Sequence, residues 1–183
     1  MFQSDPFAFV LDVDGVLTSG EFYYSKKGKI LKAFGADDFD MLDELRRSIP
    51  ISFITADKKG WDIVHKRLVE DCHYPLHYAS GDPYERWETV QSLHPNHRII
   101  FMGDGCKDFV CLSNATFSIT TCDAMAYNQE YADYVTKRPG GQRAVAEACI
   151  AIAHRYKLET FLNHNMHLSC AQERHLENHK RYG

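Results

Sequence analysis

Short apolar segments alternate with segments of helical periodicity along most of this chain. Apolar runs rich in β-branched and aromatic residues predict strands at 7–12, 51–55, 75–79, 98–103, 115–120 and 134–136. Apolar residues spaced three or four apart, with capping residues and prolines at the ends, predict helices at 37–49, 61–69, 83–93, 109–113 and 142–155. This repeated alternation is typical of an α/β fold with a doubly wound, mostly parallel sheet.

One segment near the N-terminus departs from that alternation and predicts a small β-hairpin insertion at about residues 20–34. Its two apolar arms flank a turn in which we interpret Lys26, Lys27 and Lys29 as a solvated tip. The adjacent rings of residues 22–24 cannot all face one small core, because successive side chains of a strand point to opposite faces. We therefore expect some of them to meet another surface, which favours oligomerisation.

Side chains suited to metal and phosphate chemistry follow three of the predicted strands. Asp12 and Asp14 end the first strand, Thr55 ends the second, and Asp104 and Asp108 follow the strand at 98–103. Ligands of open α/β sheets bind at the carboxyl ends of the strands. Carboxylates this close repel each other unless a cation lies between them, so the pattern predicts bound Mg²⁺ and chemistry on a phosphate. For the first segment alone, an acidic Asp-Gly turn is the alternative.

The ordered motifs resemble those of the haloacid dehalogenase superfamily of phosphotransferases. The matching residues are Asp12-Val13-Asp14-Gly15-Val16-Leu17-Thr18, Thr55, and Gly103-Asp104-Gly105-Cys106-Lys107-Asp108. Residues 18–34 and 123–145 narrow the resemblance to small sugar-phosphate phosphatases, which act on 3-deoxy-D-manno-octulosonate 8-phosphate or on 9-phosphates of sialic-acid-like sugars. The resemblance covers about residues 7–153, and implies a hairpin in place of a large cap domain and a homotetramer.

The resemblance assigns a role to each matching side chain. Asp12 is the expected nucleophile, and Asp14 the general acid that protonates the leaving oxygen. Asp12, Asp104 and the backbone carbonyl of Asp14 are the expected ligands of Mg²⁺, and Asp108 acts from outside the ligand shell. Thr55 is expected to hydrogen-bond a phosphoryl oxygen. Ala56 and Lys32 complete the predicted substrate-binding set.

The chain also departs from the family pattern. The third motif normally supplies a lysine, but residues 81–87 contain none, and Arg86 is the best substitute because a guanidinium binds phosphate bidentately. The alternative is a surface arginine at position 86, with the charge supplied by Lys58, Lys59 or a neighbouring chain.

Two further departures concern the substrate. The second motif reads Thr55-Ala56-Asp57 where Thr-Gly-Arg is usual, and Ala146 stands where the family has an arginine. Either Arg143 takes over that contact, or the anionic group of the substrate is absent.

Composition limits the number of domains, the possible partners and the cellular location. At 183 residues and 44% hydrophobic content, the chain suits one phosphatase domain at 1–155, with a helical or flexible tail at 156–183. A net charge of −4 argues against a nucleic-acid surface, and no apolar run is long enough for a membrane span. The six cysteines form no C-x-x-C pair, and the N-terminus lacks signal-peptide character, which predicts a cytoplasmic protein. The tail contains His164, His167, His175 and His179, which we interpret as part of a solvated or packed helix.

These patterns together predict a cytoplasmic, Mg²⁺-dependent phosphatase that hydrolyses a small phosphorylated metabolite through an aspartyl-phosphate. A sugar phosphate of surface-glycan or nucleotide-sugar synthesis is the expected substrate class. One alternative is a non-catalytic oligomerisation or regulatory domain associated with a sugar cytidylyltransferase. A phosphomutase is the less favoured one, because a mutase must shield its intermediate from water and no large cap is predicted.

Overall fold

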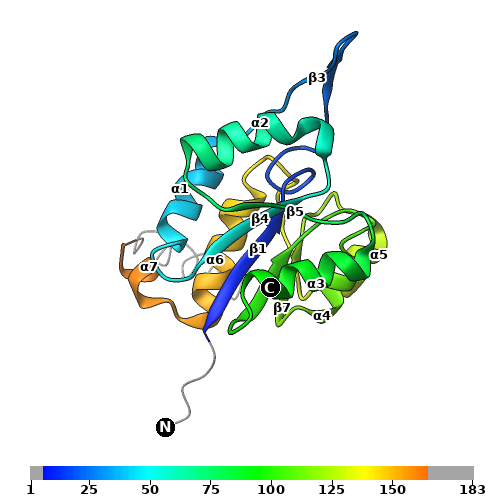
Figure 1. Cartoon of the computed structure of the whole chain (residues 1–183). Helices are drawn as coiled ribbons and strands as arrows, with labels where there is room; N and C mark the ends of the chain where they lie inside the picture. The colour runs from blue at the N-terminus through cyan, green and yellow to red at the C-terminus, as the bar shows by residue number, and fades with distance from the viewer. Residues whose placement is uncertain (1–5, 165–183) are drawn as a thin grey trace, which may run out of the picture.

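A computed structural model of the chain describes residues 6–164. Its centre is a six-stranded sheet in the order β5-β4-β1-β6-β7-β8, in which every neighbouring pair is parallel (Figure 1). The strands are β1 (Phe7–Asp12), β4 (Ile51–Thr55), β5 (Leu76–Tyr78), β6 (Arg98–Met102), β7 (Phe117–Thr120) and β8 (Tyr134–Val135). The predicted parallel α/β sheet is therefore confirmed.

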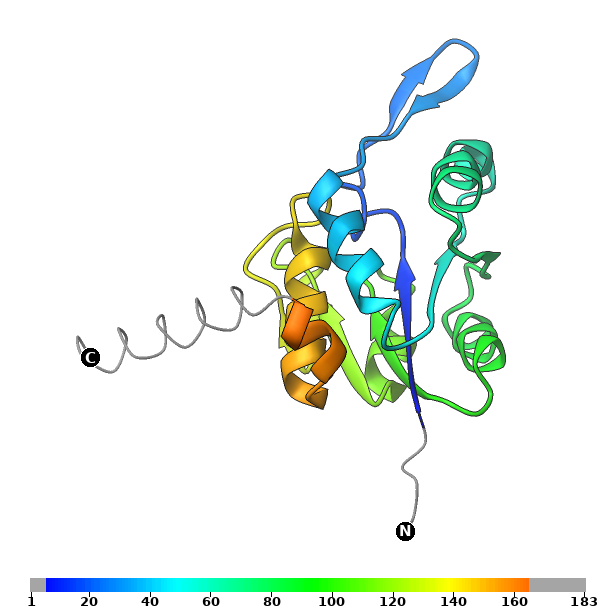
Figure 2. The same ribbon diagram turned by 90° about the vertical axis from the view of Figure 1, so that its left-hand side faces the viewer.

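Helices cover both faces of this sheet. They are α1 (Ala36–Leu45), α2 (Trp61–His65), α3 (Pro83–Leu93), α4 (Phe109–Asn114), α5 (Ala126–Tyr131), α6 (Ala144–Tyr156) and α7 (Glu159–His164). In Figure 2, α1 and α6 lie on one side of β1 and the green α3 lies on the other. The sequence pattern did not predict α5. The helix predicted at 61–69 is α-helical only to His65 and continues as a π-helical segment, η2 (Lys66–Asp71).

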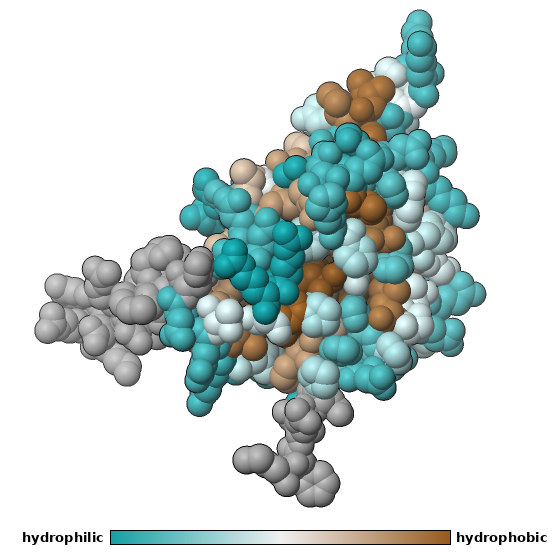
Figure 3. Space-filling view, turned by 60° about the vertical axis from the view of Figure 1, so that its left-hand side comes forward, coloured by the Kyte–Doolittle hydropathy of each residue, from teal (hydrophilic) through white to brown (hydrophobic). Residues whose placement is uncertain are grey.

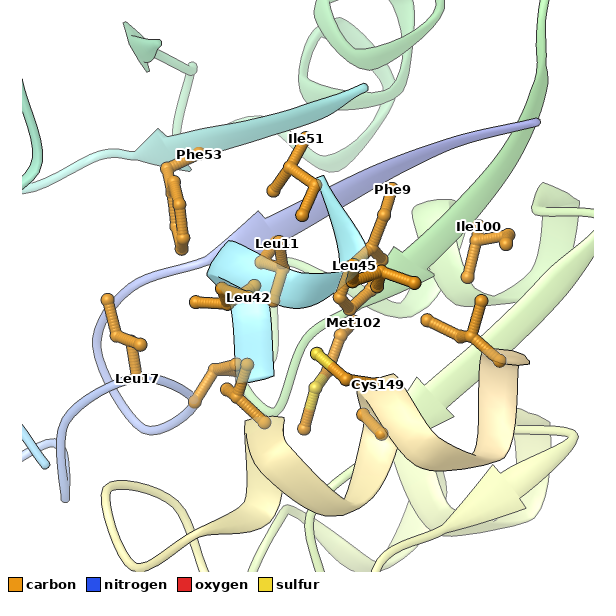
Figure 4. Close-up of a cluster of buried hydrophobic side chains, with 14 of the residues drawn as sticks. Phe9, Leu11, Leu17, Leu42, Leu45, Ile51, Phe53, Ile100, Met102 and Cys149 are labelled. Atoms are coloured by element: carbon orange, nitrogen blue, oxygen red, sulfur yellow. The ribbon is translucent and has the colours of Figure 1, made fainter. Parts of the chain in front are cut away.

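Two hydrophobic clusters hold the layers together, because alternate side chains of each strand point to opposite faces. The larger cluster joins β1, β4 and β6 to α1 and α6. Figure 4 shows its packing around Phe9, Leu11, Leu42, Leu45 and Cys149. The smaller cluster joins the other faces of β1, β4 and β6 to α3 and α4. Deep burial of the central strand fixes the position of Asp12 at its end.

The predicted hairpin is present as β2 (Tyr23–Ser25) and β3 (Gly28–Leu31), an antiparallel pair that projects from the body (Figures 1 and 2). Both strands are shorter than the pattern suggested. Hydrophobic atoms gather on the hairpin below its hydrophilic tip (Figure 3). No large cap domain covers the sheet within residues 6–164.

The C-terminal part of the described chain continues past the predicted core boundary at residue 155. Helix α6 ends at Tyr156, and α7 follows it and buries Phe161 in the larger cluster. His167, His175 and His179 lie outside the described residues, so the division at residue 155 stays a prediction. Among the helices of residues 6–164, none has the length and apolar character needed to cross a membrane.

Candidate active site

The three predicted motifs meet at one edge of the sheet. Strands β4, β1 and β6 are direct neighbours, so Thr55, Asp12 and the loop that follows Met102 end side by side. A pocket of about 300 Å³ opens there. Its lining is Asp12, Asp14, Phe22, Lys29, Thr55, Ala56, Asp57, Arg86, Gly105, Cys106, Lys107 and Asp108.

Gly15 allows the first and fourth motifs to approach each other. Its φ is +88°, a conformation that favours glycine, and a Cβ at this position would lie 2.1 Å from Oδ2 of Asp104. The Asp104 carboxylate therefore packs against backbone that only glycine supplies. The Asp14-Gly15 turn is therefore also the surface against which the fourth motif packs.

Asp12, Asp104 and Asp108 form a cluster in which one oxygen of each lies within 4.8 Å of the others. Burial, together with the neighbouring charges of Asp12 and Asp108, raises the pKa of Asp104 to about 8. Burial likewise raises the pKa of Asp12 to about 6, although Arg86 lowers it. Crowded, poorly solvated carboxylates of this kind are stabilised by a cation.

The two oxygens of Asp108 are already occupied. Oδ1 accepts a hydrogen bond from Nε of Arg86 at 2.7 Å, and Oδ2 accepts from the backbone N–H groups of Asp104 at 3.1 Å and Gly105 at 2.9 Å. Asp108 therefore shapes the loop that carries Asp104. These contacts suit a position outside a ligand shell better than direct metal coordination.

Arg86 extends from α3 into the carboxylate cluster. Its guanidinium is 2% exposed and lies 2.9 Å from Oδ1 of Asp12 through Nη2. With Asp108 on its Nε, it bridges two carboxylates on different strand ends. The alternative of a surface arginine is thus wrong for Arg86, whereas Lys58 lies over the ring of Tyr78 and does not line the pocket.

Asp14 lies beside a buried lysine. Its Oδ2 is 2.8 Å from Nζ of Lys32, and its Oδ1 accepts a hydrogen bond of 3.3 Å from Thr18. Burial raises the pKa of Asp14, and Lys32 partly offsets that effect. Lys32 itself is enclosed beneath the pocket rather than lining it. Its observed contacts are with the carboxylates of Asp14 and Asp57, and its contact with substrate stays a prediction.

Lys29 and Asp57 line the pocket, although the sequence analysis gave neither a place in the site. Lys29 was interpreted as part of a solvated tip, but its side chain is only 3% exposed, lines the pocket and pairs with Asp57. That interpretation is wrong for Lys29, because its long side chain reaches from β3 to Asp57 just after the end of β4. The unusual acid after Thr55 and Ala56 was the available signal.

Asn128, on the unpredicted α5, is a second residue that was missed. Its Nδ2 donates hydrogen bonds of 2.7 Å to the backbone carbonyls of Asp104 and Gly105. Thr120 at the end of β7 donates one to the carbonyl of Gly103, also at 2.7 Å. The loop that carries the fourth motif is therefore held from two neighbouring elements.

Arg143 is not brought to this pocket. It pairs with Asp37 and lines a separate polar pocket beside the N-termini of α1 and α6. Ala146, which stands where the family has an arginine, donates its N–H to buried Asp38 at 2.8 Å. Neither Arg143 nor Ala146 therefore contributes to the pocket at the strand ends.

The donor set fits a hard divalent cation. Asp12 and Asp104 offer carboxylate oxygens next to each other, and no histidine or cysteine completes the cluster within residues 6–164. Oxygen-only ligands favour Mg²⁺-like ions over zinc. The raised pKa values of both carboxylates show that the site favours added positive charge, either a proton or a metal ion.

Comparison with known proteins identifies relatives of this chain. No protein-family model matches the chain. The 3-deoxy-D-manno-octulosonate 8-phosphate phosphatase KdsC of Escherichia coli K12 is 30% identical over 148 residues, which span 76% of this chain and 75% of that protein. The KdsC of Yersinia pestis is 28% identical over 150 residues, with the same coverage.

Solved structures show the same fold. The 3-deoxy-D-manno-octulosonate 8-phosphate phosphatase of Moraxella catarrhalis, in complex with a magnesium ion, a phosphate ion and KDO, has a TM-score of 0.75 and 25% identity. The match covers 85% of this chain and 91% of that one. The cobalt-bound enzyme of Haemophilus influenzae has a TM-score of 0.74 and 21% identity, covering 82% and 88%.

The parallel sheet, its hairpin insertion and the ordered aspartates define a phosphatase of the haloacid dehalogenase superfamily, a phosphoric monoester hydrolase. Within that superfamily, the chain belongs to the family of the KdsC phosphatases.

Proposed function

We propose that this protein is a Mg²⁺-dependent phosphatase that hydrolyses a sugar phosphate through an aspartyl-phosphate on Asp12. The observation that carries the proposal is the placement of the Asp12 carboxylate. It ends the central strand, lines the pocket, and lies beside both the Arg86 guanidinium and the Asp104 carboxylate. A nucleophile, a fixed positive charge and an oxygen-rich cation site therefore meet at one point.

The chemistry proceeds in two displacements. An oxygen of Asp12 attacks phosphorus, the bond from phosphorus to the sugar oxygen breaks, and Asp14 gives its proton to that oxygen. Water then attacks the phosphorus of the aspartyl-phosphate, Asp14 takes a proton from it, and the bond to Asp12 breaks to release phosphate. Thr55, at the edge of the pocket, is the proposed hydrogen-bond partner of a phosphoryl oxygen.

Charge on the phosphoryl group is balanced by this chain and by a metal ion. Arg86 supplies a cation that is always protonated and is held by two carboxylates. Asp12, Asp104 and the backbone carbonyl of Asp14 are the proposed holders of Mg²⁺, and Asp108 acts from outside that set. When bound, the metal ion neutralises negative charge on the reacting phosphoryl oxygens.

The substrate class is proposed from the family. KdsC relatives act on 3-deoxy-D-manno-octulosonate 8-phosphate, and their likeness supports a sugar phosphate of surface-glycan or nucleotide-sugar synthesis. Asp57 and Ala146 differ from the pattern of small sugar-phosphate phosphatases, so a related sugar phosphate is an equally direct candidate.

Phosphate release from a panel of sugar phosphates tests the proposal. The panel contains 8- and 9-phosphorylated keto-acid sugars, heptose phosphates and hexose phosphates, each with Mg²⁺ and with a chelator, and Asp12→Asn is the blank. We expect turnover of at least one compound that needs Mg²⁺ and is lost in Asp12→Asn. Folded protein that releases no phosphate from any of them would favour the non-catalytic alternative.

We also propose that the hairpin mediates a homo-oligomer, a tetramer by family resemblance. Tyr23, Tyr24, Ile30 and Leu31 are 48–60% exposed on this short two-stranded sheet, which is too small to bury them itself. Light scattering coupled to size exclusion should give a multiple of the 21.1 kDa chain mass, and Leu31→Lys should lower it. A monomeric wild-type protein would refute this part.

A further inference from the structure

Asp57 occupies a junction between the sheet edge and the hairpin. It lies two residues after the end of β4, and its Oδ1 accepts the N–H of Gly60 at 3.0 Å, which caps the short 3₁₀ segment η1 (Lys58–Gly60). Its other oxygen, Oδ2, contacts the ammonium groups of Lys29 and Lys32, the latter at 2.8 Å. One carboxylate thus caps a turn of the core and binds two side chains of the hairpin segment.

We propose that Asp57 is a positioning residue that latches the hairpin onto the active-site pocket, and thereby sets the affinity for the organic part of the substrate. The proposal rests on the phosphatase function proposed above. It assigns a role to the third residue of the second motif, where this chain departs from the family pattern.

Burial makes the loss of one partner costly. The side chain of Lys32 is 0% exposed and that of Lys29 is 3% exposed, so water could not replace the Asp57 carboxylate beside either ammonium group. Burial raises the pKa of Asp57, but hydrogen bonds from Lys29 and Lys32 lower it more, to about 2. Asp57 is therefore ionised at any pH used for an assay, and the ion pairs persist.

The latch also fixes an aromatic wall of the pocket. Nζ of Lys29 lies 3.3 Å from the centroid of the Phe22 ring, and Nζ of Lys32 lies 5.2 Å from it. Phe22, Lys29 and Asp57 line the same pocket as Asp12. Because Asp12, Thr55 and Arg86 are assigned to the phosphoryl group, this wall is left to contact the rest of the substrate.

The backbone is adapted to the latch at Gly60. A Cβ at this position would lie 2.1 Å from Oδ2 of Asp57 and 2.9 Å from Cε of Lys32. Any larger residue would displace the carboxylate from both lysines. Gly60→Ala is therefore a second way to break the latch that leaves all three charged side chains in the protein.

The first experiment uses Asp57→Asn, because asparagine retains the cap on Gly60 but removes the charge. Asp57→Glu is the conservative variant, and Asp62→Asn, on exposed α2, is the control with the same change of charge. Each full-length variant is assayed with acetyl phosphate and with the sugar phosphate that the wild-type protein turns over fastest. Hydrogen exchange of the amides of Gly28–Leu31 reports the hairpin separately.

We expect Asp57→Asn and Gly60→Ala to raise KM for the sugar phosphate about tenfold or more. The loss in kcat/KM should be at least about tenfold larger for the sugar phosphate than for acetyl phosphate, and the hairpin amides should exchange faster. Asp57→Glu should have a KM between those of Asp57→Asn and the wild-type protein, and Asp62→Asn should have the wild-type KM. Equal losses on both substrates, or unchanged exchange in Asp57→Asn, would overturn the latch.

The outcomes separate this proposal from the phosphatase function. A wild-type protein that hydrolyses no phosphate ester refutes the proposed function, whereas the exchange measurement still decides whether Asp57 holds the hairpin. A wild-type protein that is active, with variants that leave KM unchanged, refutes the latch alone.

Discussion

Replacing Arg86 by methionine is the sharpest test of how the site is assembled. The guanidinium is 2% exposed and bridges Asp12 at 2.9 Å and Asp108 at 2.7 Å. Removing it leaves two carboxylates whose oxygens lie within 4.8 Å of each other. At that distance, with an effective dielectric constant of about 20, two unit charges repel by about 3.5 kcal/mol. Breaking a buried ion pair from one side costs about 3–5 kcal/mol, a similar magnitude.

We therefore expect Arg86→Met to lower the free energy of unfolding by about 3–5 kcal/mol in the presence of a chelator. Saturating Mg²⁺ should restore about 2–3 kcal/mol, because an ion that binds only the folded state stabilises it by mass action. Urea unfolding followed by circular dichroism, with EDTA and with Mg²⁺, measures both quantities. Arg47→Met, at an exposed arginine on the surface, is the control and should cost less than about 1 kcal/mol.

Arg86→Met also tests whether Arg86 replaces the lysine of the third motif. Loss of its fixed charge beside Asp12, the proposed nucleophile, should lower kcat by about 10²–10³ fold. Arg86→Lys keeps the charge but loses the fork that reaches both carboxylates, so its losses should be intermediate. An Arg86→Met protein as stable as Arg47→Met, with unchanged kcat, would refute the reasoning and place the charge elsewhere.

Three further predictions concern Gly15, Asn128 and His94. Gly15→Ala should abolish Mg²⁺-dependent turnover, because its Cβ would lie 2.1 Å from an oxygen of Asp104. Isothermal titration should show that this variant no longer binds Mg²⁺, and a wild-type affinity would contradict the prediction. Asn128→Ala should weaken Mg²⁺ binding by about 10–100 fold in the same titration, since the carbonyls of Asp104 and Gly105 lose their hydrogen-bond donor. An unchanged affinity would show that the loop keeps its conformation without Asn128. Burial lowers the pKa of His94, which is hydrogen-bonded to Ser52 at 2.9 Å, so the unfolded chain binds more protons below pH 6.5. Stability should therefore fall as the pH drops from 7 to 5, and His94→Gln should reduce that slope in urea unfolding; an identical slope would refute it.

Much of the fold could be predicted because strands and helices differ in their apolar periodicity. The three central strands, β1, β4 and β6, follow mostly apolar runs, and their ends bring Asp12, Thr55 and Asp104 to one edge. Helix α5 was not predicted because its residues, Ala126–Tyr131, are mostly polar or aromatic and lack an apolar stripe. Its contribution is tertiary, through Asn128.

The sequence by itself determined the α/β class, the hairpin, and the identity of the acids at the strand ends, because these depend on residues close together along the chain. Only the tertiary structure decided which charges meet: Arg86 with Asp12, Lys32 with Asp14, and Lys29 with Asp57. The partners in these pairs are separated by many residues, and local periodicity carries no information on where a long side chain ends. Lys29, which the sequence pattern places at a solvated tip, lies in the pocket because its ammonium group pairs with Asp57. A buried charge is stable only beside a partner of opposite charge.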